Sequence, residues 1–295
     1  MREPVFTGTC PAIVTPFDES GAINYDRFAQ IIEDQIAGGV DAICVMGTTG
    51  ECSTLSIREH IAAVNFCVRQ VNHRVKVIAG AGSNDTSAAV YLSQHAEDSG
   101  ADALLHVTPY YNKASQTGLV KHYEYIADRT ELPIILYNVP SRTGVSFTAE
   151  SYHILSQNPK INGVKEASGN LALVTHTRYL CGDDFYIWSG NDDQVVPLMA
   201  MGAKGVISVV ANVAPQLMVN MTHLCLDGRF EEASKLQIEN TDFIDALFIE
   251  VNPIPVKAAL NLLGRDVGGL RLPLCDISPA NLEILRSTMV RAGLL

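Results

Sequence analysis

The chain has 295 residues, of which 47% are hydrophobic, and this length and composition are typical of a globular protein with a sizeable core. Acidic residues outnumber basic ones by 32 to 21, giving a net charge of -11, and Lys and Arg form no dense run, so neither a nucleic-acid-binding nor an anionic-membrane-binding surface is expected. The N-terminus lacks an apolar signal core and no apolar run reaches the roughly 18 residues that cross a bilayer, so we expect a cytoplasmic protein.

Eight short apolar runs rich in β-branched residues recur along the chain, and a helical pattern follows each of them. They begin near Phe6, Asp41, Val75, Ala103, Ile134, Ile161, Phe185 and Gly205. Successive starts lie 20 to 35 residues apart, which is the length of one strand-then-helix unit. Eight such units predict a TIM (β/α)8 barrel with parallel strands, and a doubly wound sheet is the alternative.

Helix signals continue beyond what eight units require. The segment from Ser56 to Glu59 has the pattern of a capping box, which predicts a helix start at Ser56. Beyond about residue 215, further helices are expected over 230–248, 255–263 and 280–291. No linker rich in Pro, Gly or Ser separates them. We therefore expect residues 1–214 to form the barrel that carries the active site, and residues 215–295 to supply the last barrel helix and extra helices packed on the barrel.

Lys165 ends the sixth predicted strand. An uncharged lysine amine at a strand end can attack a ketone and form a Schiff base, whereas the alternative is that Lys165 is merely a solvated strand-end residue. Active sites of such barrels lie at the C-terminal ends of the strands. The candidate site residues at or near this rim are Thr48, Thr49, Tyr111, Tyr137, Arg142, Lys165, Gly190 and the neighbourhood of Ile207.

These side chains supply the groups that lysine-dependent carbon–carbon bond chemistry needs. Lys165 is the candidate amine, and Tyr137 is the candidate proton shuttle. The turn 47–50 offers amides and hydroxyls to one carboxylate, and Arg142 offers a bidentate fork to another. Because side chains alternate along a strand, Glu166 points away from the barrel interior, and we expect it to be structural.

Neither a metal nor a cofactor site is expected. The eight histidines form no cluster with metal-ligand spacing, and the seven cysteines contain no C-x-x-C pair, so we expect reduced thiols, most of them in the core. The turn at 80–85 starts like a dinucleotide fingerprint, but Asp85 stands at the third glycine position, which argues against nucleotide binding. Asp192 and Asp193 are interpreted as turn or helix-start residues rather than metal ligands.

Four motifs follow predicted strand ends: GTTGE at 47–51, TPYYNK at 108–113, YNVPSRTG at 137–144 and GVKEASGN at 163–170. With these motifs in this order, the sequence resembles the dihydrodipicolinate synthase and N-acetylneuraminate lyase family of Schiff-base aldolases. The resemblance spans nearly the whole chain, from Gly8 to Lys257. It implies a Schiff base between Lys165 and pyruvate, and no cofactor.

Within this family, the sequence is similar to the branch that condenses pyruvate with L-aspartate 4-semialdehyde to 4-hydroxy-tetrahydrodipicolinate, in lysine and diaminopimelate biosynthesis. The resemblance implies a proton relay of Tyr137, Thr48 and Tyr111, in which Tyr111 reaches into the neighbouring subunit's site. Oligomerisation would then be part of catalysis. A homotetramer built as a dimer of dimers is the implied assembly, although dimers also occur in the family.

The resemblance also assigns the substrate contacts. Thr49 and Ile207 match positions that contact pyruvate, and Gly190 lies by the same pocket. Arg142 matches the residue that receives the semialdehyde's carboxylate, and sugar-acid aldolases of the family lack an arginine there. The alternatives are another pyruvate-dependent aldolase, acting on neuraminate or a keto-deoxy sugar acid, and a catalytically silent regulatory relative.

One departure from the family pattern concerns regulation. His60, Asn84 and Tyr110 match a subunit-interface site at which lysine inhibits many members. However, Ala88 stands where lysine-sensitive members carry a glutamate, and Ile57 where several carry a histidine. Without the carboxylate that pairs with the ligand's ammonium, we expect weak or absent lysine inhibition.

Overall fold

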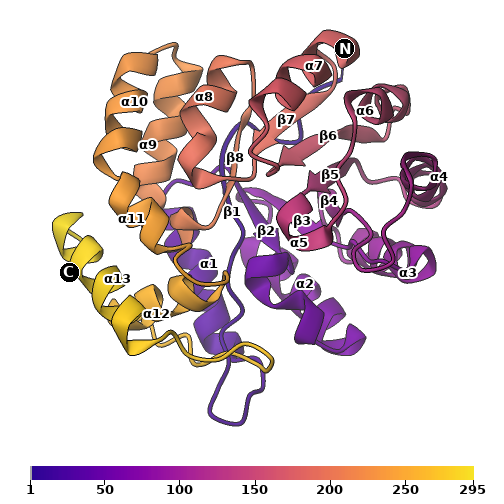
Figure 1. Cartoon of the computed structure of the whole chain (residues 1–295). Coiled ribbons are helices and arrows are strands. Elements are labelled where there is room, and N and C mark those ends of the chain that lie inside the picture. The colour runs from indigo at the N-terminus through magenta and orange to yellow at the C-terminus, as the bar shows by residue number, and fades with distance from the viewer. Residues whose placement is uncertain (1) are drawn as a thin grey trace.

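The computed structural model describes residues 2–295, and eight parallel strands form its centre (Figure 1). The sheet order is β1-β8-β7-β6-β5-β4-β3-β2. The strands are β1 (Gly8–Pro11), β2 (Ala42–Val45), β3 (Lys76–Gly80), β4 (Ala103–Val107), β5 (Ile134–Asn138), β6 (Ile161–Glu166), β7 (Tyr186–Ser189) and β8 (Gly205–Ser208). The predicted strand starts are confirmed to within two residues.

The first and last strands pair, which distinguishes a barrel from an open sheet. β1 lies parallel to β8 with Cys10 opposite Ile207. On its other side β1 reaches β2, where the Ile13 amide donates to the Cys44 carbonyl at 3.0 Å and the Asp41 amide donates to the Thr9 carbonyl at 2.9 Å. The predicted TIM barrel is therefore confirmed, and the doubly wound alternative is wrong.

A ring of helices surrounds the strands (Figure 1). It consists of α1 (Tyr25–Ala37), α2 (Ile57–Val71), α3 (Thr86–Asp98), α4 (Gln116–Ala127), α6 (Ala149–Ser156), α7 (Leu171–Cys181), α8 (Val195–Ala200) and α9 (Pro215–Leu226). The predicted capping box at the start of α2 is present, because the Ser56 hydroxyl accepts from the Glu59 amide and the Glu59 carboxylate accepts from the Ser56 amide. A short helix, α5 (Pro140–Thr143), lies in the loop after β5.

Four more helices follow the ring: α10 (Phe230–Glu239), α11 (Thr241–Ala246), α12 (Ile254–Leu262) and α13 (Pro279–Arg291). Figure 1 shows α12 and α13 side by side at the edge of the barrel, near α1. The single helix predicted over 230–248 is wrong, because the chain leaves helical geometry at Asn240, where φ is -106° and ψ is 8°. This break lets α11 pack against α13.

The barrel encloses one apolar layer, and a second layer lies between strands and helices. The inner layer includes Cys10, Cys44, Ile135, Trp188 and Ile207, all fully buried. Such side chains fill the barrel instead of leaving a pore. Within the described residues, the longest apolar helical stretches are too short or too polar to span a membrane.

Candidate active site

A cavity of about 170 Å³ lies at the C-terminal ends of the strands. Six of the eight predicted site residues line it: Thr48, Thr49, Tyr137, Arg142, Lys165 and Gly190. The remaining lining includes Ser141, Asn191 and two residues from beyond the barrel units, Phe248 and Asn252. The loops that follow β2, β5, β6 and β7 therefore converge on one small space.

Lys165 is the cavity's amine. It lies on β6, where the strand register sets it beside Tyr137 of β5 and Trp188 of β7. Only 5% of the residue is exposed, and its Nζ lies 4.4 Å from the centre of the Tyr137 ring. The interpretation of Lys165 as a solvated strand-end residue is therefore wrong, because the residue is almost fully buried.

Gly190 provides the space for the lysine stem. A Cβ at this position would lie 2.6 Å from the Ala167 Cβ and 3.1 Å from both Cγ and Cε of Lys165. Carbon atoms in contact normally lie about 3.5–4.0 Å apart. The absence of a side chain at Gly190 thus lets Lys165 extend into the cavity, a role that the sequence motif alone did not reveal.

The turn after β2 brings two threonines to the cavity. Thr48 and Thr49 belong to the 3₁₀ turn η1 (Thr48–Gly50), with Thr49 almost fully buried. The Thr49 hydroxyl accepts a 2.9 Å hydrogen bond from the Asn252 side-chain amide. Thr48 and Thr49 therefore both line the cavity that contains Lys165.

Arg142, an exposed residue of α5, also lines the cavity. Its Nη2 donates to the Asn252 backbone carbonyl at 3.1 Å. Asn252 therefore contacts both Thr49 and Arg142, and sequence reasoning assigned it no role. The only local signal is the Asn-Pro pair at 252–253, which marks a turn without indicating that the turn folds back over the barrel.

Two acidic residues near the lysine have structural partners. Glu166 points outward as predicted, where its carboxylate accepts from the Asn138 side chain at 3.0 Å and the Tyr152 hydroxyl at 2.9 Å. Burial raises the pKa of Glu166, and hydrogen bonds led by Ser168 oppose the shift. Asp192 begins the 3₁₀ turn η3 (Asp192–Gln194), and its Oδ2 accepts from two backbone amides that follow β8.

The barrel's thiols beneath the lysine are not poised as nucleophiles. Burial raises the pKa of Cys44 to about 11, despite the opposing positive charge of Lys165. Burial also raises the pKa of Cys10. All seven cysteines are free, and four of them are buried. Among residues 2–295, no group of three or more His, Cys, Asp or Glu side chains is arranged to hold a metal ion.

Two predicted site residues lie outside the cavity. Tyr111 follows β4 and is 89% exposed, with a left-handed backbone at φ 70°. Ile207, on β8, is fully buried in the inner layer, and Val209 lines the cavity instead. In a single chain, therefore, Tyr111 does not line the cavity that contains Lys165. Ile207 packs in the inner apolar layer of the barrel.

Comparison with known proteins adds family information to this geometry. Residues 5–291 match the model of the dihydrodipicolinate synthetase family. A protein of Acetivibrio thermocellus named 4-hydroxy-tetrahydrodipicolinate synthase is 50% identical over 295 residues, covering 100% of both chains.

Solved structures show the same likeness. The dihydrodipicolinate synthase of Aquifex aeolicus superposes with a TM-score of 0.96 at 41% identity, covering 98% of this chain and 99% of that chain. A structure described as the first monomeric dihydrodipicolinate synthase variant also gives 0.96 at 41% identity, covering 99% and 98%. The likeness therefore extends over sequence and fold alike.

Proposed function

The chain belongs to the dihydrodipicolinate synthetase family, and on this premise we propose how its cavity performs the family's reaction. It is a lyase that condenses pyruvate with L-aspartate 4-semialdehyde to 4-hydroxy-tetrahydrodipicolinate, a step of lysine and diaminopimelate biosynthesis. The observation that carries the proposed mechanism is the enclosed amine of Lys165, held against Tyr137 in a cavity of about 170 Å³. Pyruvate is small enough for such a space.

Lys165 first forms the Schiff base. Its Nζ attacks the ketone carbon of pyruvate, and the ketone oxygen takes up protons and leaves as water. Tyr137, whose ring packs against the amine, passes these protons with Thr48. Thr49 and the amides of its turn hold the pyruvate carboxylate. No metal is needed, because the positively charged imine stabilises the electrons of the next step.

Carbon–carbon bond formation follows. Loss of a methyl proton converts the imine into an enamine, whose terminal carbon attacks the aldehyde carbon of the semialdehyde while the aldehyde oxygen gains a proton. The substrate's own amino group then attacks the imine carbon and displaces Lys165, closing the ring. Arg142, at the cavity mouth, binds the semialdehyde's carboxylate through its planar fork.

The mouth position of Arg142 supports the semialdehyde over a sugar acid. A neuraminate or keto-deoxy sugar-acid aldolase needs hydroxyl-binding groups at the mouth, whereas a guanidinium matches a carboxylate. A silent regulatory relative would have no reason to keep the amine enclosed beside Tyr137.

We further propose that the enzyme works in the cytoplasm as a homo-oligomer, a tetramer built as a dimer of dimers. The 89% exposure of Tyr111, despite its assigned part in the proton relay, supports this proposal. A side chain that is catalytic yet faces away from its own cavity is explained if it enters the site of a second subunit.

A coupled assay tests the proposed function. Purified protein is mixed with pyruvate and L-aspartate 4-semialdehyde, and dihydrodipicolinate reductase reports product through NADPH oxidation. We expect turnover that disappears in Lys165→Ala. Folded protein without turnover, but with cleavage or synthesis of a sugar acid, would move the chain to another aldolase branch.

A further inference from the structure

A buried ion pair outside the cavity joins the C-terminal helices to the barrel. Lys257 of α12 and Glu51, the residue after η1, lie 2.9 Å apart, and each side chain is only 1% exposed. Lysine and glutamate are almost never fully buried unless they are paired. Such a pair is weak evidence for stability, because apolar residues of similar volume often stabilise a core as well. Its complete burial therefore suggests that the pair fixes the position of the segments it joins.

The acceptors around Lys257 use its full donor capacity. Besides Glu51, the Nζ donates to the Thr15 carbonyl at 3.0 Å and to the Gly269 carbonyl. An ammonium has three donors, so none is left over. It also lies 4.3 Å from the centre of the Phe17 ring. These contacts fix the position of the Lys257 side chain. Lys257 thereby links the segments that contain Thr15, Glu51 and Gly269.

Lys257 and Glu51 are both linked to the turn that carries Thr48 and Thr49. The Thr15 hydroxyl donates to the Gly50 carbonyl at 2.6 Å, so the residue of the loop after β1 that Lys257 contacts is also bonded to the turn. Glu51 has a left-handed backbone at φ 54°, which is strained for a residue with a side chain. Its second oxygen accepts from the Arg271 amide at 3.0 Å.

We infer that Lys257 and Glu51 are positioning residues of the active site, which fix the Thr48–Thr49 turn at the distance from Lys165 that pyruvate capture requires. The inference rests on the proposed roles of these threonines. On this inference, the segment 252–271 helps to position the threonines that are proposed to bind pyruvate. Neither charged side chain touches substrate, since neither lines the cavity.

The double variant Glu51→Gln/Lys257→Met tests this inference. It removes both charges, leaves an acceptor for the Arg271 amide and avoids the uncompensated buried charge of either single variant. We expect a folded protein with a lower melting temperature, because the Thr15 and Gly269 carbonyls lose their donor. We also expect a slower rate of borohydride-trapped pyruvate adduct and a kcat lower by about tenfold or more, because small misplacements of catalytic groups are costly.

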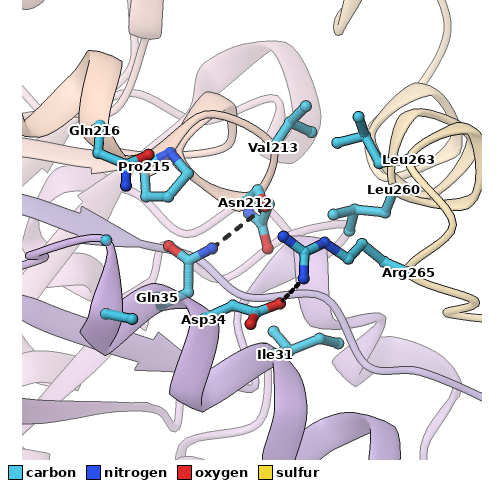
Figure 2. Close-up of a pocket in the computed structure, with 12 residues that line it drawn as sticks. Ile31, Asp34, Gln35, Asn212, Val213, Pro215, Gln216, Leu260, Leu263 and Arg265 are labelled. Atoms are coloured by element: carbon cyan, nitrogen blue, oxygen red, sulfur yellow. Dashed lines mark hydrogen bonds and ion pairs between the residues drawn. The ribbon is translucent and has the colours of Figure 1, made fainter. Parts of the chain in front are cut away.

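A matched control removes a different ion pair of the same region. Arg265, just after α12, pairs with Asp34 of α1 at 2.5 Å beside a cavity of about 250 Å³ (Figure 2). This pair also ties the C-terminal segment to the barrel, but it does not touch the turn of Thr48 and Thr49. Asp34→Asn/Arg265→Met should leave both the adduct rate and kcat unchanged.

A folded double variant with parental adduct rate and kcat would overturn the inference. If the double variant does not fold, Thr15→Val decides, because it removes only the hydroxyl bond to Gly50. The inference then requires slower capture in Thr15→Val and recovery in Thr15→Ser, and equal rates in both would overturn it. Absence of any adduct in the parent protein would instead contradict the proposed function.

Discussion

At the scale of single residues, Gly190 shows how a missing side chain shapes the site. A Cβ at this position would lie 2.6 Å from the Ala167 Cβ and 3.1 Å from two carbons of the Lys165 stem. The amine of Lys165 must extend into the space between the polar residues of the cavity to reach a bound substrate. A glycine can therefore be as necessary as a charged group.

We expect Gly190→Ala to fold but to lose about tenfold or more in kcat, because displacing the amine by even about 1 Å is costly. The loss should appear already in the rate of pyruvate adduct formation. Gly118→Ala, inside α4, is the control, since a Cβ there meets only ordinary contacts at 3.4 Å. Unchanged capture by Gly190→Ala would show that the lysine does not need this space.

Sequence reasoning worked best where a site residue lies at or just beyond the end of its own strand. Lys165, Tyr137 and Thr48 were predictable at the rim because strand ends of a barrel meet there. Asn252 was not, because its contacts with Thr49 and Arg142 depend on how a segment beyond the barrel units folds back. The local pattern at 252–253 does not indicate that Asn252 reaches Thr49 and Arg142.

At the scale of elements, a second cavity of about 360 Å³ adjoins the first and shares Thr48, Val139 and Arg142 with it. It lies between η2 (Cys52–Thr54), α2 and the loop after β4, and it includes His60 and Tyr110. These are two of the residues that the family resemblance implies for a lysine site. Ala88 lies on the neighbouring α3 and supplies no carboxylate.

We expect the parent enzyme to need more than millimolar lysine for half-inhibition. Ala88→Glu should lower that concentration by about tenfold or more, because one charge-assisted bond contributes ~1.5–3 kcal/mol. Ser87→Glu, which adds the same charge at an exposed neighbouring position, should not. Half-inhibition of the parent at submillimolar lysine would mean that the missing carboxylate does not weaken this site.

Helix prediction succeeded or failed for local reasons. The start of α2 was predictable because the capping box from Ser56 to Glu59 satisfies backbone amides within the segment itself. The break between α10 and α11 was not, because apolar periodicity continues through Asn240. The packing of α11 against α13 is a tertiary interaction, and the local periodicity does not predict it.

At the scale of the whole molecule, the barrel could be predicted because eight units of similar length leave few topologies. The assembly could not be predicted from the residues alone, since a surface of one chain does not name its partner. The assembly matters for the proposed role of Tyr111, which is exposed and has a strained, left-handed backbone. Its proposed place in the reaction requires a second subunit.

Mixing two inactive variants tests whether the site is shared. Lys165→Ala and Tyr111→Phe should each lose most activity. After subunit exchange, half of the chains pair as hybrids and each hybrid has one intact site, so about a quarter of parental activity should return. Recovery would show that Tyr111 acts across an interface. No recovery between variants shown to exchange subunits would place Tyr111 in its own chain's site or outside catalysis.

The most direct measurement is the location of the trapped intermediate. The protein is incubated with pyruvate, reduced with borohydride and digested, and the modified peptide is identified by mass spectrometry. We expect one pyruvate-derived adduct per chain, on Lys165, and none in Lys165→Ala. An unmodified protein, or an adduct on another lysine such as the buried Lys257, would contradict the assignment of Lys165 as the Schiff-base residue.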